Sequence, residues 1–292
     1  MQKIWDNICR PNTVLGYNPF LIDKMDGAMN RIAKAVNERE KIIVYGSSSV
    51  DSICGCALLI ILLKYLNADV DYFISEKKNK TFICTEDVNS HIKILGTSLI
   101  VSIGPNIESK FQESAFSDMG IDVVEIIDYE ELRDLKSISL SSNKLSLSSL
   151  TFKFTQAIGV YYNIKNVNRY IDLVMLGIAS SNKKLSGENQ IFYKEGLKYL
   201  PKSNNKGLRA LMKLHNVCEG REEQLEKIIN AITPSGNAVG ESDNARIVLE
   251  LLVTSNEYRA AQISKYLYNE FGNELSWLEN IIYGGIKDEY KR

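Results

Sequence analysis

The sequence predicts an α/β fold, a parallel β-sheet flanked by helices with a mainly helical C-terminal portion. Short apolar runs in the first half alternate with segments of helical spacing, which is typical of a parallel sheet with helices on both faces. After about residue 145, the apolar segments all have helical spacing. In KIIVYGSSSVDSICGCALLIILLKYL, residues 41–66, an apolar run stops at a glycine and an apolar helix follows. Such a strand–turn–helix is where α/β proteins commonly place functional residues.

The elements of the first part follow from the spacing of apolar residues. An amphipathic helix is expected over 21–38, where these residues recur at spacings of three and four. The run at 41–45 predicts a buried strand, and the run at 50–66 predicts a largely buried helix. A strand over 70–75 completes a strand–helix–strand unit. The same signals predict strands over 98–103 and 122–127, and a helix over 107–119.

The second part is expected to be helical throughout. Helical spacing is found in LSLSSLTFKFTQAIGVYYN, RYIDLVMLGIASS, NQIFYKEGLKYL, KGLRALMKLH, REEQLEKIINAI, ARIVLELLVTS and YRAAQISKYLYNEFGNELSWLENII. The segment PSGNAVGESDNA, residues 234–245, predicts a glycine-containing turn. The polar stretch KSISLSSNKLS, residues 136–146, is the best candidate for a linker. We therefore expect an α/β core over 1–140 and a helical portion over 141–292 that ends in a long connector helix.

Composition and charge are those of an ordinary soluble globular protein. Lys and Arg total 35 against 36 Asp and Glu, which counts against a dedicated nucleic-acid binder but leaves room for a local basic groove. The five cysteines have no spacing suited to zinc. The N-terminus lacks the apolar core of a signal peptide, and no uncharged apolar run is long enough for a membrane span. We expect a cytoplasmic protein without membrane contacts.

Several segments occur in one order along nearly the whole chain. They are NPFLIDKMDGAMNRI, YGSSSVDS, SLIVSIGP, MGIDVVEIIDYEEL, YIDLVMLGIASS, NQIFYKEGLKYL, KGLRALMKL and PSGNAVGESDNARIVLELLVTS. In this order they resemble the RecJ-like single-stranded-DNA exonucleases of the DHH phosphoesterase superfamily. The resemblance implies a DHH-type sheet whose helical portion, 141–292, belongs to the same domain. It also implies that the DHHA1 and OB domains that follow in RecJ are missing here.

The chemistry of that family implies two divalent metals, usually manganese, held by aspartates and a histidine about 3.5–4 Å apart. The resemblance places the family's ligand positions on Ser47, Ser49, Asp51, Ser102, Asp128, Tyr129, Glu130 and Ser181. Of the aspartates, only Asp51 and Asp128 remain. Serine hydroxyls are much weaker ligands for such ions than carboxylates. The resemblance therefore implies that no catalytic site is intact.

Serines at these positions fit a fold that has lost its metals. Clustered carboxylates without a metal would repel one another, and serine removes that repulsion. Asp51 is interpreted first as a residue that stabilises the N-terminus of its own helix. Asp51 and Asp128 are the weak metal candidates. No cofactor is expected, with Mn²⁺ or Mg²⁺ as the alternative.

A second set of residues is a candidate for binding an anion or DNA. Gly46, Ser47 and Ser48 form a turn before a helix, whose backbone N–H groups suit an anion. In the late motif Asn237, Ala238 and Gly240 persist, but Glu241 stands where the family has an arginine. That change removes the side chain that could hold a phosphate.

Three functional hypotheses follow from the resemblance. The first is a catalytically inactive RecJ-like domain that acts as a binding or scaffold protein in DNA replication or repair. Its partner would be a protein of that machinery or an active RecJ-like relative. The second is a metal-dependent phosphoesterase or 5′–3′ exonuclease with an altered metal site, for which Glu86, Asp87 and Glu130 are further candidate ligands. The third is a single-stranded-DNA binder without hydrolysis, which predicts a basic groove beside Gly46.

Overall fold

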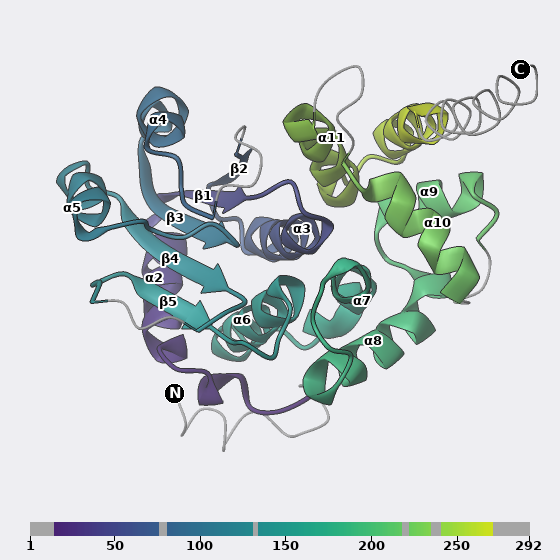
Figure 1. Ribbon diagram of the computed structural model, residues 1–292, viewed down its shortest axis with the longest axis horizontal. Coiled ribbons are helices and arrows are strands. Elements are labelled where there is room, and N and C mark those ends of the chain that lie inside the picture. Colours follow the sequence, from purple (N-terminus) through teal and green to yellow (C-terminus); the bar gives the residue numbers. More distant parts are fainter. Residues whose placement is uncertain (1–14, 76–80, 131–133, 218–221, 235–240, 271–292) are drawn as a thin grey trace, which may run out of the picture.

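The computed structural model describes residues 15–75, 81–130, 134–217, 222–234 and 241–270 (Figure 1). Five parallel strands form one sheet in the order β2-β1-β3-β4-β5. They are β1 (Lys41–Gly46), β2 (Val70–Ile74), β3 (Thr97–Ile103), β4 (Asp122–Ile127) and β5 (Ile138–Ser141). This confirms the predicted fold class, and the order is that of a doubly wound sheet.

Helices cover both faces of the sheet. On one face lie α2 (Met25–Glu38), α3 (Val50–Tyr65) and α6 (Leu147–Tyr161), which share the larger apolar core with the sheet. On the other lie α4 (Thr85–Asp87), η2 (Val88–Ile92), η3 (Lys93–Leu95) and α5 (Lys110–Asp118) (Figure 1). A short helix, η1 (Pro19–Leu21), precedes α2. The strands carry apolar residues on both faces, as expected for a parallel sheet buried between helices.

Gly46 ends β1 where the chain turns toward α3. A Cβ atom at this position would lie 2.6 Å from Cys56 Sγ and 3.1 Å from Ile74 Cδ1. The turn therefore has room only for glycine. Ser49 then caps α3, because its side chain accepts a hydrogen bond from Ser52 N at 3.2 Å.

The expected linker over 136–146 contains a strand. Residues Ile138–Ser141 form β5, which pairs with β4 at the edge of the sheet. Ser146 then caps α6 by accepting a hydrogen bond from Ser149 N at 3.1 Å. The sequence predicted a loop here because the stretch is rich in serine and only Leu140 of β5 is fully buried. The division at residue 140 remains a prediction.

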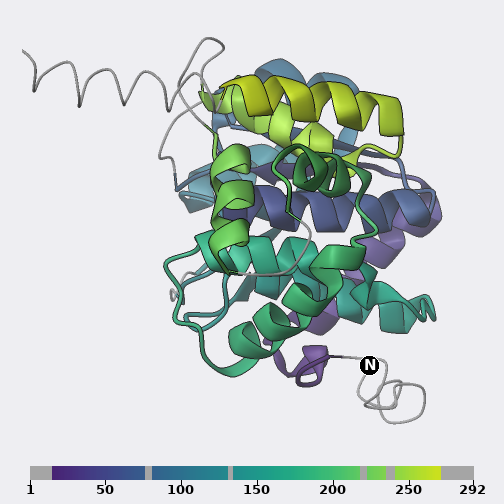
Figure 2. The same cartoon turned by 90° about the vertical axis from the view of Figure 1, so that its right-hand side faces the viewer.

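The second part of the described chain is helical, as predicted. It comprises η4 (Val167–Tyr170), α7 (Ile171–Ser180), α8 (Gly187–Tyr199), η5 (Leu200–Lys202), α9 (Lys206–Leu214), α10 (Glu222–Ile232), α11 (Glu241–Val253) and a helix over 257–270 (Figure 2). Helices α7 and α11 pack on α3, and residues from both parts of the chain share the larger core. In the described part of the chain, every helix is too short or too polar to cross a membrane.

Asp172 predicts a pH dependence of stability. It lies fully buried in the first turn of α7, where its Oδ1 accepts a hydrogen bond from Leu173 N at 3.0 Å. Burial raises the pKa of this carboxyl from 3.8 to about 6. A raised folded-state pKa means that the folded chain binds the proton more tightly, so the stabilisation present at low pH is lost as pH rises from about 4 to about 6.

The variant Asp172→Asn removes this ionisation while keeping the shape of the side chain. We expect it to raise the free energy of unfolding above that pH window by about 2 kcal/mol, because the shift of about two pKa units corresponds to nearly 3 kcal/mol. The gain should shrink toward pH 4. Urea denaturation of both proteins across this pH range measures the difference. A difference independent of pH would contradict the assignment.

Candidate functional site

The carboxyl ends of β1 and β3 are the natural place for a site. The strand order reverses between these two strands, and crevices for ligands form at such a reversal in open α/β sheets. The turn over 46–49 follows β1, and Gly104, with φ 100°, begins the turn after β3. Several of the predicted positions lie at this edge, because Ser47, Ser49 and Asp51 follow β1, Ser102 lies near the end of β3, and Asp128 follows β4.

Two of the three serines after β1, Ser47 and Ser49, make hydrogen bonds within the turn. Ser47 N donates to Ser52 Oγ at 3.0 Å, and the hydroxyls of Ser47 and Ser49 lie 3.2 Å apart. Ser52 Oγ in turn donates to the carbonyl oxygen of Ile103 at 2.6 Å and ties the turn to β3. These bonds close the turn and join β1, α3 and β3.

Asp51 is buried and joins two helices. Its Oδ2 accepts a hydrogen bond from Leu147 N at 2.8 Å, and its Oδ1 accepts one from Ser148 N at 2.9 Å. Both donors belong to the first turn of α6. The carboxylate therefore stabilises the N-terminus of α6, and not only that of its own helix as the sequence suggested.

Burial raises the pKa of Asp51 to about 6, although the hydrogen bonds from Ser148 and Leu147 oppose the rise. The negative charge of Asp128 adds to it, so the two surviving aspartates interact electrostatically. Helix α7 closes over Asp51 at Gly177, where a Cβ would lie 2.7 Å from Asp51 Oδ1 and 2.3 Å from Ser148 Oγ. Asp51 is thus enclosed by α3, α6 and α7.

Asp128 faces a cation that the sequence did not single out. Lys183 Nζ lies 3.3 Å from Asp128 Oδ2, and it also donates to the carbonyl oxygen of Asp128. Ser181 holds the same loop, since its Oγ accepts a hydrogen bond from Lys183 N at 3.3 Å and donates to Ile178 O at 2.9 Å. A metal ion would need the carboxylate of Asp128 as a ligand, but the ammonium group of Lys183 already places a positive charge beside it. The lysine two residues after Ser181 was the available signal for it.

The remaining predicted positions make contacts within the fold. Ser102 is fully buried and donates to the carbonyl oxygen of Pro105. The hydroxyl of Tyr129 accepts a hydrogen bond from Asn106 Nδ2 at 2.6 Å. Glu130 makes a long contact among the described residues, 3.5 Å from Oε2 to Asn143 Nδ2.

The further candidate ligands Glu86 and Asp87 bind elsewhere. Asp87 Oδ2 accepts a hydrogen bond from the buried Tyr45 hydroxyl at 2.8 Å, and Glu86 Oε2 accepts one from Cys84 Sγ at 2.8 Å. Asn237, Ala238 and Gly240 lie outside the described residues.

The residues present do not fit a two-metal centre. Over the described ranges, no three His, Cys, Asp or Glu residues come together as metal ligands would. Both oxygens of Asp51 accept backbone N–H bonds, and Asp128 pairs with Lys183. Of the other predicted positions, Glu130 is exposed, and the rest offer serine hydroxyls and a phenol, which are poor ligands for Mn²⁺ or Mg²⁺.

Comparison with known proteins agrees with this architecture. The model of the DHH family, N-terminal domain, matches residues 41–178. The single-stranded-DNA-specific exonuclease RecJ of Bacillus subtilis is 26% identical over 258 residues, which cover 85% of this chain and 32% of that protein. RecJ of Thermus thermophilus is 24% identical over 78% of this chain and 35% of its own length. The chain thus spans about a third of the length of these relatives.

Solved structures share the fold. The crystal structure of an exonuclease RecJ bound to manganese aligns with a TM-score of 0.77 at 21% identity, over 90% of this chain and 69% of that one. RecJ from Thermus thermophilus in complex with Mn²⁺ aligns with a TM-score of 0.76 at 21% identity, over 90% of this chain and 40% of that one. The matched sequence segments, the strand order and these alignments point to one family. The chain therefore carries a RecJ-like domain of the DHH superfamily.

Proposed function

We propose that this RecJ-like domain does not hydrolyse phosphodiesters through two metals and acts as a binding or scaffold protein in DNA replication or repair. One observation carries the proposal: the two surviving aspartates already have partners within the protein. Asp51 binds the N-terminus of α6, and Asp128 pairs with Lys183.

A metal ion at this site would have to compete with those contacts. Releasing Asp51 would leave two buried N–H groups of α6 without acceptors, and hydrogen bonds to a charged group contribute about 1.5–3 kcal/mol each. The ion would also meet the ammonium group of Lys183, which repels it. These costs oppose metal binding before the loss of ligands at Ser47, Ser49, Ser102 and Ser181 is counted.

The partner is proposed by analogy with the relatives, which are named single-stranded-DNA-specific exonucleases. A protein of the replication or repair machinery, or an active RecJ-like relative, would bring this chain to DNA. Such a role needs the fold and its surfaces but no reactive centre. It also agrees with the expected cytoplasmic location.

The alternative function is a single-stranded-DNA exonuclease with an altered metal site. The names of relatives that match over 78% to 85% of this chain favour it. It requires ligands to join Asp51 and Asp128 from residues outside the described ranges, or a rearrangement that frees both carboxylates.

Release of nucleotide from 5′-labelled single-stranded DNA with excess Mn²⁺ tests the proposal. We expect no turnover above that of the variant Asp128→Asn, while RecJ of Bacillus subtilis serves as the positive control. Asp128 is the better position to change, because its partly exposed side chain supports the fold less than Asp51 does. Manganese-dependent release that Asp128→Asn abolishes, with an unchanged melting temperature, would establish the exonuclease instead.

A third arm of the same experiment measures DNA binding without hydrolysis. Binding that weakens steeply with salt, and weakens further in Lys183→Ala, would assign the carboxyl edge of the sheet as a single-stranded-DNA surface.

A further inference from the structure

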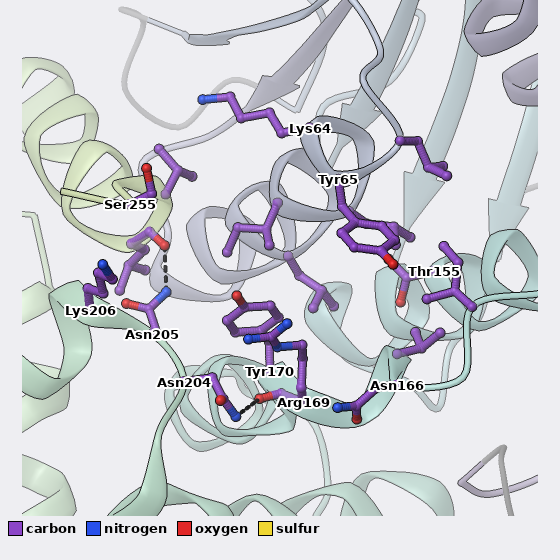
Figure 3. A pocket seen from close by; sticks show the side chains of 18 of the residues that line it. Lys64, Tyr65, Thr155, Asn166, Arg169, Tyr170, Asn204, Asn205, Lys206 and Ser255 are labelled. Carbon is purple, nitrogen blue, oxygen red and sulfur yellow. Dashed lines mark hydrogen bonds between the residues drawn. The ribbon is translucent and has the colours of Figure 1, made fainter. Parts of the chain in front are cut away.

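A cavity of about 1110 Å³ lies at the opposite end of α3 from the site described above. The C-terminal end of α3 forms one wall, together with the loop after α6 and η4 (Figure 3). The segment that leads into α9 and the C-terminal end of α11 form the rest. Because α3 begins at the carboxyl edge of the sheet and runs away from it, this cavity is separate from the degenerate metal site.

The lining of the cavity is rich in positive charge. It includes Lys64, Lys165, Arg169 and Lys206, against one acidic residue, Glu250. The carboxylate of Glu250 is already paired, since Arg259 Nε and Nη2 lie 2.7 Å and 3.0 Å from its two oxygens. Among described acidic residues only Glu257 pairs with any of the four cations, 3.5 Å from Lys206.

The negative ends of nearby helices offset part of this positive charge but not all of it. The C-terminal ends of α3, α6 and α11 border the cavity, and each carries about half a negative charge. The N-terminus of α9 contributes an opposite half charge. Four cationic side chains exceed this sum, so the cavity keeps a net positive potential that favours an anion.

Aromatic rings lie beside the cations. Tyr65, at the end of α3, is 67% exposed and stands across the cavity from Arg169 and Tyr170 (Figure 3). The guanidinium of Arg169 lies 5.0 Å from the centroid of the Tyr170 ring. Its Nε is buried without a hydrogen-bond partner in the described part of the chain. An exposed ring opposite a guanidinium suits a flat aromatic group that carries an anionic substituent.

Amide side chains complete the wall. Asn204 Nδ2 donates to the carbonyl oxygen of Arg169 at 3.1 Å, which fixes η4, the short helix that carries the guanidinium. Asn166 lies beside Arg169, on the same side of the cavity (Figure 3). Amide groups can pair with the polar edge of a nucleobase.

We propose that this cavity binds a free nucleoside phosphate, with its base on Tyr65 and its phosphate groups on Arg169 and Lys165. The volume exceeds what a ligand of this size needs. The positive charge matches the phosphate groups, and the exposed ring and the amides match the face and the polar edge of the base. The proposal does not depend on the proposed loss of hydrolysis, because its residues lie apart from the carboxyl edge of the sheet.

Isothermal titration calorimetry of the full chain with ADP tests this site. We expect saturable binding at least tenfold tighter than that of adenosine or inorganic pyrophosphate, because each of these probes has only part of the required chemistry. Arg169→Met and Tyr65→Ala should each weaken ADP binding at least tenfold. Lys194→Ala is the matched control, since Lys194 is an exposed lysine of α8 that does not line the cavity.

The two site variants differ in how much they are expected to disturb the fold. Arg169 is partly buried, but Tyr65 is largely exposed, so Tyr65→Ala should keep the melting temperature of the parent. Binding of ADP no tighter than adenosine or pyrophosphate overturns the proposal. Equal ADP affinity in Tyr65→Ala and Lys194→Ala overturns it as well, and so does binding of a 5′-phosphorylated oligonucleotide without binding of ADP.

Discussion

Asp51→Ala is expected to lower the free energy of unfolding by about 3 kcal/mol. The substitution removes the acceptor of two N–H groups at the start of α6, and each buried group left without a partner costs about 1–3 kcal/mol. Part of this cost is offset, because the buried carboxylate itself is poorly solvated, as its pKa of about 6 indicates. Urea denaturation above pH 7 measures the change.

Asp128→Ala is the matched control for this prediction. Asp128 also sits at the carboxyl edge of the sheet and also carries one negative charge, but its side chain is 34% exposed and its partner is one lysine. A pair of this kind contributes about 0–1 kcal/mol. A loss in Asp51→Ala no larger than that in Asp128→Ala would show that the contact with α6 is not important for stability.

This difference decides how mutagenesis of the site can be interpreted. A loss of any function in Asp51→Ala could come from a loosened α6 rather than from a lost ligand. Asp128→Asn also removes one negative charge from the site, but it leaves the contact between Asp51 and α6 in place. Only the second variant therefore separates a chemical role from a structural one.

The sequence predicted local structure better than contacts between distant residues. The strand and helix around Gly46 follow from an apolar run, a glycine and a serine cap, which are all close together along the chain. The strand β5 escaped prediction because ISLS carries only one fully buried residue. Its pairing with β4 is a tertiary effect that overrides the local polarity.

The partners of Asp51 and Asp128 could not be predicted in this way. Leu147 and Ser148 lie almost a hundred residues from Asp51, and Lys183 is 55 residues from Asp128. The resemblance indicated which positions had lost carboxylates, but not which protein groups had taken their place. The cationic cavity could not be predicted for the same reason, because its lining comes from five separate helices, α3, α6, η4, α9 and α11, and the loops beside them.

Ser102→Asp restores the family's residue at a predicted ligand position, and we expect it to lower the free energy of unfolding by about 4 kcal/mol. Ser102 is fully buried and donates to the carbonyl oxygen of Pro105. An ionised carboxylate cannot donate this bond and brings an unpaired charge into the interior, which costs several kcal/mol. Glu125 adds to the cost, because it pairs in register with Ser102 on the next strand, so the two acidic side chains would share one face.

Ser102→Ala is the control, with an expected loss of about 1 kcal/mol for the missing hydrogen bond. Burial would raise the pKa of the new carboxyl, so the excess loss in Ser102→Asp should fade as pH falls and the group is protonated. Excess Mn²⁺ should not restore the melting temperature, because Asp51 and Asp128 keep their partners in α6 and Lys183. Stabilisation of Ser102→Asp by Mn²⁺, without an effect on Ser102→Ala, would mean that these positions still converge on a metal. The loss of the centre would then depend on the serines alone, and the argument that the contacts of Asp51 and Asp128 exclude a metal would fail.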